Sequence, residues 1–216
     1  MNDTLVILFC KAPLVGKAKT RLSASIGNRK AYLIYEYSLR KTITKLKKIN
    51  SVDRMIAYSS GTEETTYFNK LVKNFKLIRD EKGTFNQKLS ASFYLGFRLG
   101  YKKVIAIGAD SPDLPKDYIM EGISKLSKYD SVIGFTKDGG YYLLGLRSPD
   151  ILEKVFKVKS SKSNTALKIE KVLRKAGKRV KIIPRWYDID TVEDLNAFRA
   201  RHPYTNPFGK SGNKAE

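Results

Sequence analysis

Four cationic side chains lie within eleven positions after the first apolar segment of the sequence. They are Lys11, Lys17, Lys19 and Arg21, and Gly16 lies among them. Ammonium and guanidinium groups donate to phosphoryl oxygens, and a glycine lets the backbone approach a ligand closely. The segment therefore suits a polyphosphate, although it has neither the G-x-x-x-x-G-K-[ST] nor the G-x-G-x-x-G spacing. A solvent-exposed basic turn is the alternative.

Two carboxylates follow a later apolar segment, Lys103–Gly108, in the sequence Asp110-Ser111-Pro112-Asp113. Proteins hold magnesium with one or two carboxylates together with substrate phosphates, so Asp110 alone could anchor a cation. The alternatives are a turn at Asp110 and a helix cap at Asp113.

A second acidic pair, Asp188 and Asp190, lies near the end of the sequence on either side of Ile189. If this segment is a strand, alternation places both carboxylates on one side, where both could face a cleft. One of them would then complete a metal site. Capping of the last helix by Asp190 or Thr191 is the alternative, and the two roles are compatible.

The segment Asp138-Gly139-Gly140-Tyr141-Tyr142 is a candidate acceptor site. Adjacent glycines can bend sharply or approach a ligand, and tyrosines can flank a sugar or a base. The expected acceptor-binding residues are Asp138, Gly139, Gly140 and Tyr141. A hairpin turn with core tyrosines is the alternative.

Hydrophobic patterning predicts the elements that must position these residues. The predicted strands are Thr4–Cys10, Val52–Tyr58, Phe75–Ile78, Lys103–Gly108, Ser131–Phe135, Tyr141–Leu146, Arg179–Ile183 and Tyr187–Ile189. The predicted helices are Asn28–Ile49, Glu63–Asn74, Gln87–Leu99, one near Pro115, Asp150–Phe156, Asn164–Ala176 and a last one from a capping box at Thr191–Asp194 to Arg201. Strands 131–135 and 141–146 form a hairpin or belong to separate sheets.

This alternation predicts an α/β fold, a three-layer α/β/α sandwich with a mostly parallel central sheet. Ligands of such folds bind beyond the carboxyl ends of the strands. The loops after Cys10, after Gly108 and near Ile189 are therefore expected to meet. The length of 216 residues favours one domain, 1–202, followed by a polar, flexible tail, 203–216.

The composition favours an anionic partner, because 42 Lys and Arg against 21 Asp and Glu give a net charge of +21. Nucleic acid, an acidic membrane surface and a phosphate-bearing ligand all fit, and the lysines are scattered as on solvated faces. Cys10 is the only cysteine, which excludes an intramolecular disulfide and a multi-thiolate zinc site. Serine and cysteine triads are not supported, since His202 is the only histidine. We expect no signal peptide, no transmembrane segment and a cytoplasmic location.

Four ordered motifs resemble the glycosyltransferase-like, radical-SAM/selenodomain-associated transferases of the nucleotide-diphospho-sugar transferase (GT-A) superfamily. The matching residues are Lys11-Ala12-Pro13 with Gly16 and Lys19–Leu22, then Gly108–Leu114, then Asp138–Tyr142, and Asp188–Thr191 with Glu193–Leu195. More distantly, the chain is similar to guanylyltransferases of molybdenum-cofactor and phospholactate pathways.

The resemblance implies a phosphate-binding loop that contains Lys11, Ala12, Pro13 and Gly16, with Lys19 and Arg21 on the nucleotide phosphates. It also implies that Asp110 binds the metal, Mg²⁺ or Mn²⁺, and that Asp190 or Asp188 is the second ligand. The chain departs from the family at Gly83–Lys88, where relatives have an acidic and arginine-bearing stretch.

These residues predict a magnesium-dependent transferase with Lys19, Arg21 and Asp110 as its catalytic groups. It would act on a nucleoside triphosphate or a nucleotide sugar and an unknown small acceptor, by nucleotidyl or glycosyl transfer. The alternatives are a basic nucleic-acid-binding protein and a nucleotide-binding relative without catalysis.

Overall fold

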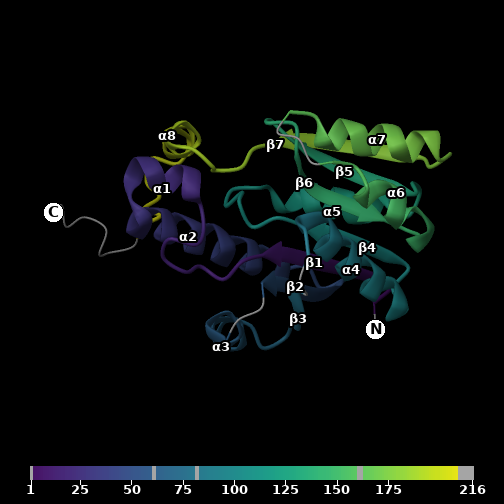
Figure 1. Cartoon of the computed structure of the whole chain (residues 1–216), viewed down its shortest axis with the longest axis horizontal. Helices are drawn as coiled ribbons and strands as arrows, with labels where there is room; N and C mark the ends of the chain where they lie inside the picture. Colours follow the sequence, from purple (N-terminus) through teal and green to yellow (C-terminus); the bar gives the residue numbers. More distant parts are fainter. Residues whose placement is uncertain (1, 60–61, 81–82, 160–162, 209–216) are drawn as a thin grey trace.

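The computed structural model describes residues 2–59, 62–80, 83–159 and 163–208, and within them one sheet has the strand order β3-β2-β1-β4-β6-β5-β7 (Figure 1). The strands are β1 Thr4–Cys10, β2 Asp53–Ser59, β3 Lys76–Asp80, β4 Lys103–Ile107, β5 Ser131–Thr136, β6 Tyr141–Leu146 and β7 Val180–Trp186. Strand β6 is antiparallel to β4 and β5, and the other pairs are parallel. The predicted mostly parallel α/β fold is confirmed.

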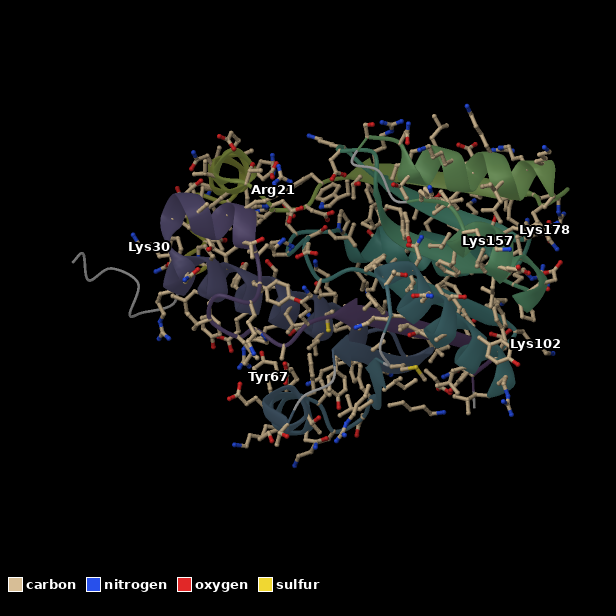
Figure 2. The ribbon with its side chains drawn as sticks, viewed as in Figure 1. Arg21, Lys30, Tyr67, Lys102, Lys157 and Lys178 are labelled. Atoms are coloured by element: carbon tan, nitrogen blue, oxygen red, sulfur yellow. The ribbon has the colours of Figure 1, made fainter. Side chains whose placement is uncertain are left out.

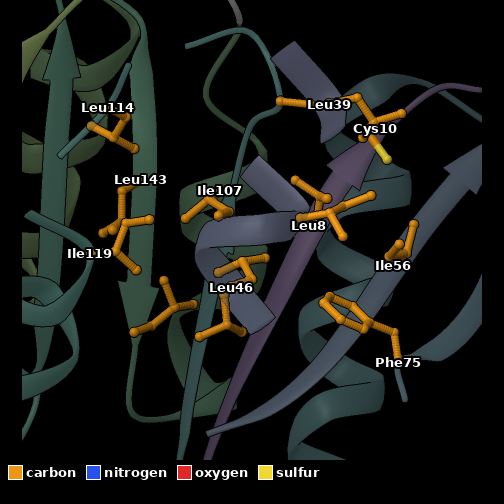
Figure 3. Packing of buried hydrophobic residues seen from close by; sticks show 14 of the residues in the cluster. Leu8, Cys10, Leu39, Leu46, Ile56, Phe75, Ile107, Leu114, Ile119 and Leu143 are labelled. Atoms are coloured by element: carbon orange, nitrogen blue, oxygen red, sulfur yellow. The ribbon is translucent and has the colours of Figure 1, made fainter. Parts of the chain in front are cut away.

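Helices cover both faces of the sheet because successive strand residues point to opposite sides. The helices are α1 Thr20–Ile26, α2 Asn28–Lys47, α3 Thr62–Leu71, α4 Phe85–Arg98, α5 Lys116–Lys125, α6 Leu152–Phe156, α7 Thr165–Lys175 and α8 Val192–Arg201. Leu8 of β1 packs in one core with residues of α2, α3 and α5, among them Leu39 and Leu46 (Figure 3). Ile7 lies in the opposite core with residues of α4, α6 and α7.

A third, smaller core joins α1, α2 and α8 at one end of the molecule, beyond the carboxyl end of β1 (Figure 1). Leu22 of α1, Ile34 of α2 and Leu195 of α8 are each at most 1% exposed. Ile189 is buried in the same cluster, so the segment after β7 is anchored to the helices that follow β1. This core therefore holds the segments that follow β1 and β7 together at this end.

Two predictions of secondary structure are wrong. Helix α1 was not expected, because its seven residues contain two serines and a threonine and follow a cationic loop. Of the two strands predicted around Pro184, the first extends to Trp186 as β7, and the second, Tyr187–Ile189, is not a strand. A proline is tolerated in β7 because this strand lies at the edge of the sheet.

The other elements lie where the sequence predicts them, with boundaries shifted by a few residues. Strands β5 and β6 form a hairpin, which decides between the two alternatives. Thr191 and Asp194 form the expected capping box of α8.

The predicted tail is described as far as Phe208, whose ring centroid lies 4.8 Å from the guanidinium carbon of Arg199. Residues 209–216 lie outside the described part. None of the helices described is long and apolar enough to cross a bilayer.

Candidate functional site

A pocket of about 530 Å³ opens at the carboxyl ends of β1 and β4. Its lining residues come from five parts of the chain: Phe9, Cys10, Lys11, Lys17, Ala18, Lys19, Thr20, Arg21, Tyr35, Gly83, Phe85, Lys88, Asp110 and Asp190. The loops after β1 and β4 and the segment after β7, which were predicted to meet, therefore all line one pocket. Figure 2 shows Arg21 at the end of α1 that faces the sheet.

Lys19 joins the two acidic segments at the base of this pocket. Its Nζ lies 2.5 Å from Oδ1 of Asp110 and 2.8 Å from Oδ1 of Asp190. The Lys19 side chain is 3% exposed, whereas both carboxylates are 41% exposed. Burial alone would lower the pKa of Lys19, but the two carboxylates outweigh it and raise this pKa to about 12. Lys19 therefore stays charged at neutral pH.

The backbone at Lys19 adopts a conformation that few residues other than glycine adopt. With φ of 53°, Lys19 is the non-glycine residue with positive φ in the described part of the chain, and it immediately precedes α1. Such a conformation costs about 1 kcal/mol or more and persists where the surroundings enforce it. Here the buried side chain of Leu22 and the two ion pairs hold the turn in place.

The loop after β4 and the segment after β7 are joined directly. The Ile189 amide donates to the Asp110 carbonyl oxygen at 3.1 Å, and the Ser111 hydroxyl donates to Oδ1 of Asp188 at 2.6 Å. Burial, together with the charge of Asp110, raises the pKa of Asp188 to about 7, and the Ser111 hydrogen bond offsets only part of this shift. Asp188 and Asp190 both line one smaller pocket, as expected, but only Asp190 also lines the 530 Å³ pocket.

Asp113 does not cap a helix, since Pro115 precedes the first residue of α5 and makes no side-chain cap. Its carboxylate instead accepts hydrogen bonds from the Trp186 indole, at 3.3 Å, and from the Tyr187 hydroxyl. It also lies 2.9 Å from Nε2 of His202 at the end of α8. Asp113 therefore ties the β4 loop to two distant segments and does not line the pocket.

The predicted phosphate loop divides into ligand-facing and supporting residues. Lys11, Lys19 and Arg21 line the pocket, whereas Ala12 and Pro13 are buried beside it. The Tyr35 hydroxyl accepts from the Lys11 amide at 2.9 Å and donates to the Lys11 carbonyl at 3.1 Å, which fixes the start of the loop. Gly16 also lies outside the lining, where its φ of 77° forms the turn.

The predicted acceptor residues are only partly brought to the site. Asp138 lies with Arg21, Asp188 and Asp190 in an adjoining pocket of about 200 Å³. Its Oδ1 accepts from the Thr136 hydroxyl at 2.5 Å. Gly139 lines a separate pocket beside α7. Gly140 and Tyr141 lie outside these pockets, and Tyr141 packs in the core, so this part of the segment is the hairpin turn that was the alternative.

Gly83, Phe85 and Lys88 line the pocket although sequence reasoning gave them no role. Phe85 is 55% exposed, and its ring packs edge-on against Phe9, with 5.1 Å between the centroids. A capping box between Thr84 and Gln87 fixes the start of α4 and so places Phe85 at the pocket. The sequence feature that could have indicated this position is the capping pattern of Thr84 and Gln87, which directly follows Gly83.

The oxygens of Asp110 and Asp190 fit a hard divalent cation, which prefers carboxylates. Each carboxylate lines the pocket and gives one oxygen to Lys19. In the part of the chain that the structure describes, no group of three or more His, Cys, Asp or Glu side chains is arranged to hold a metal. A cation at this position would therefore take further oxygens from substrate phosphates or water.

The fold is of the GT-A type found in nucleotide-diphospho-sugar transferases. A candidate nucleotide-diphospho-sugar transferase from Desulfovibrio desulfuricans G20 superposes with a TM-score of 0.87 at 28% identity, covering 98% of this chain and 92% of that one. The 4-diphosphocytidyl-2C-methyl-D-erythritol synthase of Anaerococcus prevotii DSM 20548 shares the fold, with a TM-score of 0.62 at 14% identity and coverage of 93% and 97%. Residues 42–159 match the family described as "Uncharacterized protein conserved in bacteria (DUF2064)", and the chain belongs to this family.

Two relatives are 2-phospho-L-lactate guanylyltransferases. The protein from Methanocaldococcus jannaschii is 31% identical over 140 residues, which are 64% of this chain and 58% of that protein. The protein from Methanocaldococcus vulcanius is 24% identical over 150 residues, which are 69% of this chain and 64% of that protein. The matches thus span about three fifths of these curated relatives.

Proposed function

We propose that this protein is a divalent-metal-dependent nucleotidyltransferase that binds a nucleoside triphosphate in the 530 Å³ pocket. The observation that carries the proposal is the meeting of Lys19 with Asp110 and Asp190, from three distant segments, in a pocket whose lining also includes the cations Lys11, Lys17, Arg21 and Lys88. The relatives that transfer guanylyl groups support the same reaction class.

The side chains of the pocket suggest how the triphosphate lies. Lys17 and Arg21 would donate to the phosphates, and the exposed Phe85 ring offers an aromatic wall for the base. Asp110 and Asp190 would hold Mg²⁺ or Mn²⁺, which would supply positive charge to offset that of the phosphates. An acceptor oxygen would attack the α-phosphorus from the adjoining pocket near Asp138, the bond from the α-phosphorus to the bridging oxygen would break, and pyrophosphate would leave.

Product analysis tests this proposal. The protein is incubated with each nucleoside triphosphate, Mg²⁺ or Mn²⁺ and a panel of phosphorylated and hydroxylated acceptors, and pyrophosphate is measured. Asp110→Asn should lower the rate by at least about 10²-fold, because it removes one of the two carboxylates that would hold the divalent metal. Asp117→Asn is the matched control, since Asp117 is exposed on α5 and lies outside the pocket.

Glycosyl transfer is the second candidate, since a close structural neighbour is described as a nucleotide-diphospho-sugar transferase. It predicts release of a nucleoside diphosphate from nucleotide sugars and no pyrophosphate from triphosphates. Binding of nucleotides without either product would indicate a non-catalytic relative.

A further inference from the structure

The ammonium of Lys19 takes the position that a cation would take between two carboxylates. It lies 2.5 Å from Asp110 and 2.8 Å from Asp190 and is 3% exposed, while both acids remain 41% exposed. Two negative charges and one positive charge leave this cluster with a single net negative charge. Asp188 lies close enough for its charge to act on Lys19 as well.

The Lys19 ammonium is in contact with both carboxylates at once. Taking this charge out of the cluster without replacement would leave two carboxylates facing each other. Only another cation can take its place.

New anionic partners for Lys19 would arrive in the pocket that it already lines. A lysine side chain carries its ammonium, a compact point charge, on a stem of four carbons that can adopt other rotamers once its ion pairs are replaced. Lys19 enters from the first loop, on the same wall as Lys17 and Arg21. A polyphosphate held by these neighbours would lie within reach of the Lys19 ammonium.

We propose that Lys19 is an exchangeable internal counter-ion, which occupies the cation position between Asp110 and Asp190 in the free protein and moves to a polyphosphate when a divalent metal takes its place. This inference rests on the proposed function, in that the ligand is a metal-bound polyphosphate. It adds that the free protein binds the metal alone weakly, and that metal and polyphosphate reinforce each other's binding. A permanent bridge role for Lys19 predicts the opposite, namely that its removal disorders the carboxylates and weakens metal binding.

Binding of Mn²⁺ in the absence of any nucleotide separates these roles, with free Mn²⁺ measured by electron paramagnetic resonance. Lys19→Met should bind Mn²⁺ at least about tenfold more tightly than the wild-type protein, because a positive charge in contact with both carboxylates is gone. Lys17→Met is the matched control: it removes the same charge from the same pocket, but Lys17 is exposed. Its Mn²⁺ affinity should stay within about twofold of the wild-type value.

Lys19→Gly is a second variant that protects the test against misfolding, since glycine accepts the left-handed backbone at this position. It should bind Mn²⁺ as tightly as Lys19→Met, with circular dichroism and thermal unfolding confirming the fold. Equal or weaker Mn²⁺ affinity in both folded Lys19 variants would overturn the inference, as would an equal gain in Lys17→Met. Pyrophosphate release by the wild-type protein is measured separately, so the proposed function can stand while the counter-ion role fails, and the reverse.

Discussion

At the scale of single residues, Asp188 and Asp190 show how environment separates two identical side chains. Asp190 is 41% exposed, is paired with Lys19 and lines the 530 Å³ pocket together with Asp110. Asp188 accepts a hydrogen bond from Ser111, lies outside that pocket and has a pKa raised to about 7 by burial and by Asp110. The two side chains therefore have different partners and different access to the pocket.

The raised pKa of Asp188 predicts a pH dependence of stability in the metal-free protein. An unfolded aspartate ionises near pH 3.8, whereas Asp188 in the folded protein ionises near pH 7. The folded state therefore holds the proton more tightly, and the stability that this contributes is lost as pH rises from about 4 to 7. Between pH 5 and 8, the wild-type protein should lose about 1–3 kcal/mol relative to Asp188→Asn.

Urea unfolding with a chelator present, at pH 5 and at pH 8, measures this difference. Asp117→Asn should follow the wild-type pH dependence, because Asp117 is exposed. Parallel curves for Asp188→Asn and wild type would show that Asp188 titrates normally.

At the scale of elements, apolar patterning predicted most strands and helices because buried strands are continuously apolar and helices end at recognisable caps. The patterning failed where contacts between distant segments determine the secondary structure. Helix α1 has little propensity of its own and is stabilised by burial of Leu22 against α2 and α8. The segment after Trp186 leaves the sheet because Ile189 bonds to the loop of Asp110, which no local pattern encodes.

The candidate site was predictable where it follows from strand topology and unpredictable where it depends on tertiary contacts. The cationic loop and Asp110 follow apolar strands, so parallel topology alone brings them together. The pairing of Lys19 with both acids requires the left-handed turn at Lys19, and no residue type in the sequence predicts this turn. Phe85 enters the pocket from α4, whose position depends on packing across the whole sheet.

Asp113 connects three elements, which gives a prediction at this scale. Asp113→Ala leaves the part-buried donors of Trp186 and Tyr187 without their acceptor and removes the partner of His202 at the end of α8. The free energy of unfolding should fall by about 2–4 kcal/mol. Urea unfolding measures this loss of free energy of unfolding, and Asp117→Ala is the control because Asp117 is exposed.

His202 supplies an independent readout, because a single histidine gives a single set of ring signals in proton NMR. Its chemical shift should move in Asp113→Ala and stay constant in Asp117→Ala. Unchanged stability together with an unchanged His202 signal would mean that Asp113 does not hold α8 to the β4 loop.

At the scale of the whole molecule, the net charge of +21 predicts binding to any polyanion at low salt. Of the basic residues labelled in Figure 2, Lys30 lies at one end of the molecule and Lys102, Lys157 and Lys178 lie at the other, so positive charge is present at both ends. Polynucleotide affinity should fall by about 10³-fold between roughly 50 and 200 mM salt, as expected when counterion release dominates.

Asp110→Asn should leave this affinity unchanged or increase it, because it removes a negative charge, whereas it should abolish metal-dependent nucleotide binding. Filter binding across a salt series, with inorganic triphosphate as competitor, measures both effects; tight polynucleotide binding that resists salt would make a nucleic acid the partner in place of a small nucleotide.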